Sequence, residues 1–460
     1  MKIFKKEGIV YDVFNRIRLR DFSGNTGLAI KNSSFQFFTN AVSKVGTLLF
    51  TVIIARLLMP ELFGLYSLAF STILLFATIS DFGIGSTLVR FISKEIERRN
   101  LKKVRAYLSY LGKIKFFIIS VLIVVLVVSA RFISNTFYNK PIFLALIAGT
   151  LYILFYGLTL LLQSVLQSFN KFRAIFFGET IFQFFRIILI SLAVLLSLKF
   201  ALSNELLLFY LFLALGVSYL LVALFLGYIL IRKVKIFGAE KLVLSGKQKK
   251  QTNKFLIALS ASTLSGILFS YIDRIMLGHF VAAEFIGYYT IALSFVSAAS
   301  VFAGFGSALL PIFSRVNKNK LEIGFKKSIK LSLIFGIVST ILILILASPI
   351  ISIIYGREYL AATNLLRLLS LSFFTLPLSG LYTVYFMSRN KPQIIAKLSI
   401  ISTVLNIVLN YLLITTLLGY SSFAATFGAG IALLLSQFFY IAALEIARRR
   451  DLKKENKPIE

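Results

Sequence analysis

Residues 114–135 read IKFFIISVLIVVLVVSARFISN, a largely apolar run whose only charged residues are Lys115 and Arg131. The hydrocarbon core of a bilayer is about 30 Å thick, and a helix needs roughly 20 apolar residues to cross it. This stretch is long enough and apolar enough to do so. It therefore predicts a transmembrane helix rather than a helix of a soluble core.

The composition of the whole chain agrees with this stretch. Of its 460 residues, 58% are hydrophobic, and the mean hydropathy is +0.88. A soluble domain is typically about 45–50% apolar. We therefore predict an all-α integral membrane protein with about twelve transmembrane helices. The expected spans cover residues 35–58, 62–89, 114–135, 141–168, 172–198, 205–231, 255–278, 284–313, 331–355, 362–387, 393–418 and 422–446.

The charges predict the orientation of these spans. The chain has 50 Lys and Arg against 18 Asp and Glu, a net charge of +32. Forty of the basic residues fall in the two terminal segments and in every second loop, whereas the other loops hold four. Those four are Arg131, Lys140, Lys199 and Arg357. Cytoplasmic loops carry the excess of Lys and Arg, so we expect the cytoplasmic membrane with both termini in the cytoplasm.

The same placement disfavours nucleic acid as a partner. In a soluble protein, a charge this basic would indicate nucleic-acid binding. Here most of the charge lies in short loops beside predicted spans, so we expect membrane lipids as partners and no nucleic acid.

The two halves of the chain resemble each other. Glu61-Leu62-Phe63-Gly64-Leu65-Tyr66 matches Glu284-Phe285-Ile286-Gly287-Tyr288-Tyr289, and Asn170-Lys171 matches Asn390-Lys391. Residues 56–59 match residues 274–277, which makes Arg56 and Arg274 equivalent. Each matched pair falls on the same predicted side of the membrane, which is typical of parallel repeats about an axis along the membrane normal.

The repeat predicts the domain organisation. We expect two six-helix lobes that face a central cleft and work by alternating access. The predicted segments are a basic N-terminal segment 1–34, an N-lobe 35–231, a basic linker 232–254, a C-lobe 255–446 and a basic tail 447–460.

Several chemistries are disfavoured. The chain has no Cys, and His279 is its only histidine, which excludes disulfides and multi-histidine metal sites. No nucleotide-binding, dinucleotide-binding, zinc-protease or serine-hydrolase motif is present. A membrane glycan polymerase or ligase would need a sizeable outer loop, and none is predicted. We therefore expect a transporter with no cofactor and no metal, and not an enzyme.

Charged residues inside spans are costly and usually face a cavity. The basic members of this set outnumber the acidic ones, and a cationic cleft suits an anionic headgroup. The candidates for substrate binding are Lys44, Arg56, Arg186 and Arg274. The candidates for coupling or for pairing with these cations are Asp81, Glu179 and Asp273.

Each candidate also has a purely structural interpretation. Lys44 lies about 13 Å of helix into its span, so it either lines the cavity or snorkels toward the headgroups. Glu179 and Arg186 share one helix face with Gln183 and could neutralise each other. Asp273 and Arg274 could form an interfacial salt bridge. Asp81 could cap a helix or pair with Arg90.

The repeat segments also resemble a known family. Residues 54–66 (IARLLMPELFGLY), 273–278 (DRIMLG) and 80–85 (SDFGIG), together with the second repeat motif at 284–289, resemble the polysaccharide-synthesis, O-antigen flippase-like branch of the multidrug/oligosaccharidyl-lipid/polysaccharide (MOP) exporter superfamily. This resemblance implies a MATE-like fold.

The resemblance also implies a substrate. The cargo would be a polyprenyl-(pyro)phosphate-linked glycan, flipped to the outer leaflet, and glycan-assembly enzymes are possible partners. The alternative within the same superfamily is an ion-coupled small-molecule or multidrug exporter.

Overall fold

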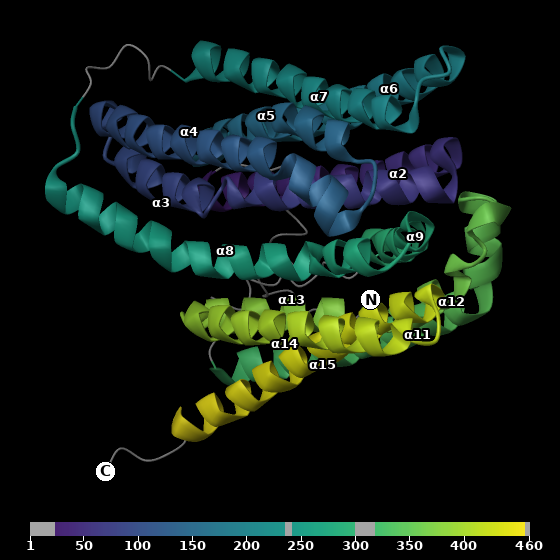
Figure 1. Ribbon diagram of the computed structural model, residues 1–460. Helices are drawn as coiled ribbons and strands as arrows, with labels where there is room; N and C mark the ends of the chain where they lie inside the picture. Colours follow the sequence, from purple (N-terminus) through teal and green to yellow (C-terminus); the bar gives the residue numbers. More distant parts are fainter. Residues whose placement is uncertain (1–23, 235–241, 300–317, 456–460) are drawn as a thin grey trace.

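The computed structural model describes residues 24–234, 242–299 and 318–455. Within these ranges the chain is almost entirely helical and contains no strand, so the prediction of an all-α protein is confirmed (Figure 1). The predicted segments outside these ranges, which include 300–313 of the eighth span, lie beyond the described residues.

The predicted spans lie on helices, but two of them are interrupted: span 62–89 at residues 80–83 and span 362–387 at residues 370–371. The first half contains α2 (Gly24–Ile79), α3 (Ile84–Glu97), α4 (Leu101–Arg131), the π-helix η1 (Phe132–Tyr138), α5 (Phe143–Ser168), α6 (Phe172–Lys199) and α7 (Asn204–Lys233). The second half contains α8 (Gly246–Phe280), α9 (Ala283–Ala299), α11 (Lys318–Ile354), the 3-10 helix η3 (Arg357–Tyr359), α12 (Ala362–Leu369), α13 (Ser372–Ser388), α14 (Pro392–Leu418) and α15 (Ser422–Glu455).

Helix α2 holds two predicted spans joined at a kink. Met59 has a φ of 60°, in the left-handed region, and Pro60 follows it. Proline has no N–H for the helical hydrogen bond and its ring crowds the preceding turn, which accounts for the kink. The chain turns back here between the first and second predicted spans.

Nine helices or merged helix pairs within the described ranges are long and apolar enough to cross a membrane. The first of these, Lys31–Glu97, contains the first two predicted spans. Helices α8 and α9, which carry the seventh and eighth predicted spans, are not among the nine. The count by length and composition is therefore lower than twelve, although every predicted span lies at least partly on a described helix.

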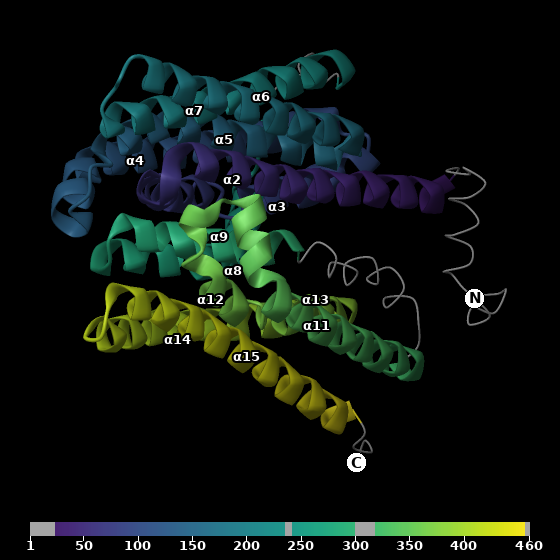
Figure 2. The ribbon, with the colours of Figure 1, turned by 90° about the vertical axis from the view of Figure 1, so that its right-hand side faces the viewer.

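The helices gather in two groups. Figures 1 and 2 show α2–α7 on one side and α11–α15 on the other, with α8 and α9 between them. Helix α9 packs on α2 and α12, and α8 packs on both α2 and α14. This arrangement is consistent with the two predicted six-helix lobes.

The helix bundle has two ends, which we call the basic end and the opposite end. The basic end carries the turns near residues 98–100 and 389–391 and the start of α8 at Gly246. The opposite end carries the kink at Met59, the end of η1 at Tyr138, the α8–α9 turn near residue 281 and the end of α11 at Ile354.

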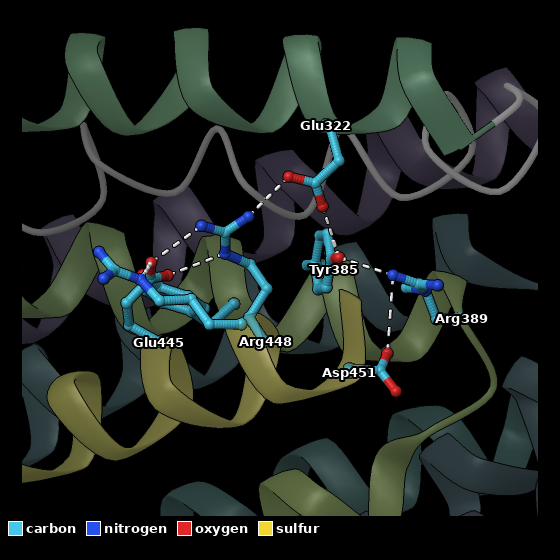
Figure 3. A network of polar contacts seen from close by, with 8 residues as sticks. Glu322, Tyr385, Arg389, Glu445, Arg448 and Asp451 are labelled. Carbon is cyan, nitrogen blue, oxygen red and sulfur yellow. Dashed lines mark hydrogen bonds and ion pairs between the residues drawn. The ribbon is translucent and has the colours of Figure 1, made fainter. Parts of the chain in front are cut away.

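A polar network holds the basic end of the second group together (Figure 3). Arg448 of α15 donates to Glu322 of α11 at 2.6 Å and to both carboxylate oxygens of Glu445 at 2.8 Å. Tyr385 of α13 donates to Glu322 at 2.6 Å and accepts from Arg389 at 2.8 Å. Three helices are therefore joined here by charge-assisted hydrogen bonds, which are stronger than neutral ones.

Candidate functional site

A cavity of about 610 Å³ lies between the two groups of helices. Its lining comes from α2, α5, α6 and α7 of the first half and from α8, α9, α13 and α15 of the second. A site built between two such groups changes shape when they move relative to each other. This is the geometry on which alternating access depends.

The wall formed by α6 carries a chain of polar contacts. Glu179 accepts a hydrogen bond from Gln183 at 2.7 Å, and Gln183 accepts one from Arg186 at 2.5 Å. The acid and the base are therefore joined through the amide and not directly. The face shared by these three residues, which their spacing of four and three predicts, points into the cavity.

Arg186 is held in the wall from several sides. It is 4% exposed and donates to the carbonyl of Gly46 on α2 at 3.1 Å. Its guanidinium lies 4.2 Å from the centre of the Phe50 ring and 5.0 Å from that of Phe182. Such cation–π contacts are strong where the cation is desolvated. Its Nε has no hydrogen-bond partner in the part of the chain that the structure describes.

Lys44 differs from Arg186 in having no partner. It lies on α2, lines the cavity and is exposed. Its ammonium makes no hydrogen bond or ion pair within residues 24–234, 242–299 and 318–455. Lys44 is therefore a cation of the first half of the chain that is available to an anion in the cavity.

The wall formed by α8 carries Asp273 and Arg274, which do not pair with each other. Asp273 is 3% exposed and accepts hydrogen bonds from Tyr289 of α9 at 2.9 Å and from Asn410 of α14 at 2.8 Å. Arg274 donates to the Ser270 carbonyl at 2.8 Å and lies over the Tyr271 ring. No carboxylate in the described ranges forms an ion pair with Arg274, so it is a second cation available to an anion.

The surroundings of Asp273 contain unused polar atoms. Asn406 lies one turn before Asn410 and is fully buried. Neither polar atom of its side chain has a partner among the described residues, and the same holds for Oδ1 of Asn410. Buried polar groups normally have partners, so this cluster has capacity for one more polar ligand.

Four tyrosines in the cavity lining were not predicted from the sequence: Tyr152, Tyr156, Tyr219 and Tyr271. Tyr152 and Tyr156 stack at 5.5 Å, and Tyr219 meets both edge-on at 5.2 Å. A signal for them was present, because Tyr152, Tyr156, Thr159 and Gln163 follow the helical spacing of one face of an otherwise apolar span.

The structure places Arg56 away from the cavity. Its guanidinium donates to the carbonyls of Ile354, at 2.8 Å, and Ile353, at the end of α11. Because the kink at Met59 and Pro60 ends the first span only one turn later, Arg56 sits at the rim of the opposite end. Its repeat equivalent Arg274 lies almost two turns before the end of α8 and reaches the cavity.

Asp81 also lies outside the cavity lining. It accepts a hydrogen bond from Lys115 of α4 at 2.9 Å, and the Lys115 side chain is 1% exposed. Arg90, the partner considered from the sequence, lies over the ring of Phe255 instead. Lys115 is therefore the buried ion-pair partner of Asp81, which lies in the turn between α2 and α3.

Five of the seven candidates therefore meet in one cavity. Lys44, Glu179 and Arg186 come from the first half, and Asp273 and Arg274 come from the second. The groups present are cations, carboxylates, amides and tyrosine hydroxyls. Within the described ranges, no group of three or more His, Cys, Asp or Glu that could hold a metal occurs.

Two protein-family models match parts of this chain. The family model described as "Polysaccharide biosynthesis protein" matches residues 29–317, and the MatE model matches residues 258–412. No curated protein matches the chain.

Solved structures share the fold at low sequence identity. A multidrug resistance MATE family transporter of the MOP superfamily, in an inward-facing conformation, is similar with a TM-score of 0.69 and 12% identity over 90% of this chain and 96% of that one. The lipid II flippase MurJ is similar with a TM-score of 0.69 and 16% identity over 90% and 87% of the two chains. The eukaryotic MATE transporter AtDTX14 is similar with a TM-score of 0.57 and 14% identity over 91% and 95%.

The first family model covers more than half of the chain, and the helices share the fold of the MATE family transporter. The chain therefore belongs to the polysaccharide biosynthesis protein family, and it is a multi-pass membrane protein with the fold that the MATE transporters and MurJ share.

Proposed function

We propose that this protein is a flippase that moves lipid-linked oligosaccharide units across the cytoplasmic membrane by alternating access. The observation that carries the proposal is a cavity that holds one cation from each half of the chain, Lys44 and Arg274, neither of which forms an ion pair within the described residues. The phosphate of a polyprenyl-(pyro)phosphate would bind between them. The sugars would remain in the cavity and the prenyl chain in the bilayer.

The polar lining suits such a headgroup. Arginine and lysine bind phosphate by charge and by hydrogen bonds, and arginine does so in a fixed fork geometry. Tyrosine hydroxyls and the amides of Gln163 and Gln437 offer neutral hydrogen bonds to sugar hydroxyls. The family match supports a glycan, and the MurJ structure is that of a flippase for another lipid-linked substrate.

For the orientation, we infer that the basic end faces the cytoplasm. The loops at this end carry most of the Lys and Arg residues, and such loops are retained on the cytoplasmic side. Under this orientation, the two predicted lobes meet at the outer face and the basic N- and C-terminal segments lie inside.

For the driving force, we propose Asp273 as the coupling group. It is a carboxylate of the cavity wall, held by Tyr289 and Asn410, beside the unpartnered side chain of Asn406. A proton or a small cation bound here would change the charge of the cavity during the cycle. Buried carboxylates within membrane spans commonly serve proton and ion pathways.

The flippase proposal is tested by binding. The protein is reconstituted in nanodiscs, and its binding of a prenyl-pyrophosphoryl oligosaccharide is measured for the wild type, Lys44→Ala, Arg274→Ala and Lys397→Ala. Lys397 is an exposed lysine of α14 outside the cavity lining, so it is the matched control. We expect each cavity variant to bind about tenfold more weakly, as loss of one charge-assisted hydrogen bond implies, and the control to bind normally. Absence of binding by the wild type would overturn the proposal.

An ion-coupled exporter of small cations is the second candidate. The observation that favours it is the pair of carboxylates in the lining, Glu179 and Asp273, together with the MatE match to residues 258–412. Export of a cationic dye by proteoliposomes, lost in Glu179→Gln, would support this candidate. The net excess of cations in the cavity supports the flippase.

A further inference from the structure

At the opposite end of the bundle, the two halves are linked by cations that end on backbone carbonyls. Arg56 of α2 donates to the carbonyls of Ile353 and Ile354, the last two residues of α11. Lys140, in the connection between η1 and α5, donates to the carbonyl of Gly278 at 2.7 Å, two residues before α8 ends. Each cation comes from the first half, and each acceptor belongs to a helix of the second.

The acceptors explain why cations are used. The last four carbonyls of a helix have no partner within it and form the negative end of the helix dipole. Arg56 and Lys140 thus satisfy carbonyls that would otherwise lack a partner inside the protein. Lys140 is half-buried, and this burial lowers the pKa of its ammonium from its ordinary value.

A third link joins the same two regions. The hydroxyl of Tyr359, which is 1% exposed, donates to the carbonyl of Ala55 at 2.8 Å. Ala55 directly precedes Arg56 and lies one turn before the kink at Met59. Tyr359, from the second half of the chain, therefore bonds to the backbone beside Arg56. His279, adjacent to the Lys140 acceptor Gly278, meets the carbonyl of Phe137 at 2.6 Å. The links therefore form two clusters, one at Arg56 and one at Lys140.

We propose that Arg56 and Lys140 form the latch of the outer gate, each by capping the C-terminus of a helix in the opposite lobe. This inference rests on the proposed alternating access, in which the outer end must open. When the lobes separate there, both cations leave their carbonyls and become hydrated. A cation on a helix end suits a reversible latch, because no carboxylate is left buried and unpaired when the contact breaks.

The test uses the natural lack of cysteine in the chain. Ser294→Cys places a single thiol on α9 in the cavity lining. Its reaction with a membrane-impermeant maleimide is timed in right-side-out and in inside-out vesicles, alone and combined with Arg56→Gln, Lys140→Gln or both. Arg131→Gln is the matched control, because Arg131 is an exposed cation at the same end with no polar partner in the described residues.

We expect labelling in right-side-out vesicles to rise about tenfold in Lys140→Gln, as loss of one hydrogen bond from a charged donor implies. The rise should be larger in Arg56→Gln, which loses two such bonds, and largest in the double variant. Labelling in inside-out vesicles should fall or stay constant, and Arg131→Gln should behave as the parent. Arg56→Lys, which keeps a cation without the fork, should lie between the parent and Arg56→Gln.

Equal labelling of the parent and the latch variants from the outer face would overturn the proposal. Variants are compared only after gel filtration shows a monodisperse protein, and Arg56→Lys provides a milder substitution if Arg56→Gln fails to fold. Substrate binding by the latch variants is measured in parallel. A wild type that binds no prenyl-pyrophosphoryl oligosaccharide would refute the flippase and leave the labelling result valid, so the two failures are distinguishable.

Discussion

Gly64 of α2 and Gly287 of α9, which hold the same position in the two sequence repeats, pack against each other where the two halves of the chain meet. A Cβ added to Gly287 would lie 2.7 Å from the carbonyl oxygen of Pro60 and 3.4 Å from the backbone nitrogen of Gly64. A Cβ added to Gly64 would overlap the carbonyl oxygen of Ala283. The repeat thus supplies both sides of one backbone-to-backbone contact, which only small residues allow.

The first prediction concerns this contact. Gly64→Ala should separate α2 from α9 and favour an open outer end, because the obstacle is rigid backbone and not a flexible side chain. Labelling of Ser294→Cys from the outer face should therefore rise. The control is Gly227→Ala on α7, where a Cβ would meet no atom within 4 Å. A Gly64→Ala variant that labels like the Gly227→Ala variant would show that the contact does not limit opening.

The arrangement of the helices was predictable in large part from simple patterns. Apolar run length predicted the spans. The repeat motif at residues 61–66 and 284–289 falls on α2 and α9, but the contact between these two helices was not predicted. The kinked join within α2 was less accessible. It depends on the local backbone at Met59 and Pro60, which span length alone does not reveal.

A second prediction tests the ion pair between Asp81, in the turn that follows α2, and Lys115 of α4. Asp81→Asn leaves the ammonium of Lys115 buried without a carboxylate and should lower the free energy of unfolding by about 3–5 kcal/mol. Replacing both, as Asp81→Asn with Lys115→Met, removes the stranded charge and should restore most of this loss. Thermal melting followed by circular dichroism gives the comparison.

If the double variant lost as much stability as Asp81→Asn, the stranded charge of Lys115 could not be the cause of the loss. Lys115→Met alone supplies the remaining corner of the double-mutant cycle. Its expected loss is smaller than that of Asp81→Asn, because Asp81 is 23% exposed and reaches solvent while Lys115 does not.

A third prediction concerns the network of the basic end. Arg448 contacts Glu322 and Glu445 and has a side chain that is 9% exposed, whereas its neighbour Arg449 contacts Glu445 alone and is 71% exposed. Arg448→Met should lower the free energy of unfolding by about 3–5 kcal/mol, because two carboxylates lose a buried partner. Arg449→Met should cost about 0–1 kcal/mol, as is usual for exposed pairs.

Arg448 and Arg449 carry the same charge, lie on the same helix and contact the same carboxylate of Glu445. Both substitutions change the net charge equally, so Arg449→Met is the matched control for Arg448→Met. Melting temperatures measured in the same detergent decide the matter. Similar losses for Arg448→Met and Arg449→Met would show that the network of Figure 3 contributes little beyond surface electrostatics.

The candidate site shows where sequence reasoning ends. Depth within a span and helical spacing led to Lys44, Glu179 and Arg186, which line the cavity. The repeat grouped Arg56 with Arg274, but equivalent positions need not have equivalent surroundings. The two halves meet at the opposite end, where Arg56 donates to a carbonyl at the end of α11. Arg274 lies farther from that end and lines the cavity. Contacts between distant helices, such as that of Asp81 with Lys115, depend on packing that neither composition nor spacing contains.

The last prediction concerns the proposed coupling group. Asp273→Asn keeps the size of the side chain and an acceptor for Tyr289, but it removes the negative charge and the capacity to bind a proton or cation. Substrate binding should persist, because the phosphate is assigned to Lys44 and Arg274. The dependence of flipping on an imposed proton or sodium gradient should fall about 5–150-fold, the usual range of coupling between two sites.

Two variants separate coupling from structure in that experiment. Tyr289→Phe removes one hydrogen bond to Asp273 and retains the carboxylate, so gradient-driven flipping should survive in it while stability falls by about 1–3 kcal/mol. Proton and sodium gradients are imposed separately on proteoliposomes, which identifies the ion. If Asp273→Asn responds to both gradients as the wild type does, the carboxylate serves only to join α8 to α9 and α14. In that case Glu179, the other carboxylate of the lining, becomes the residue to replace.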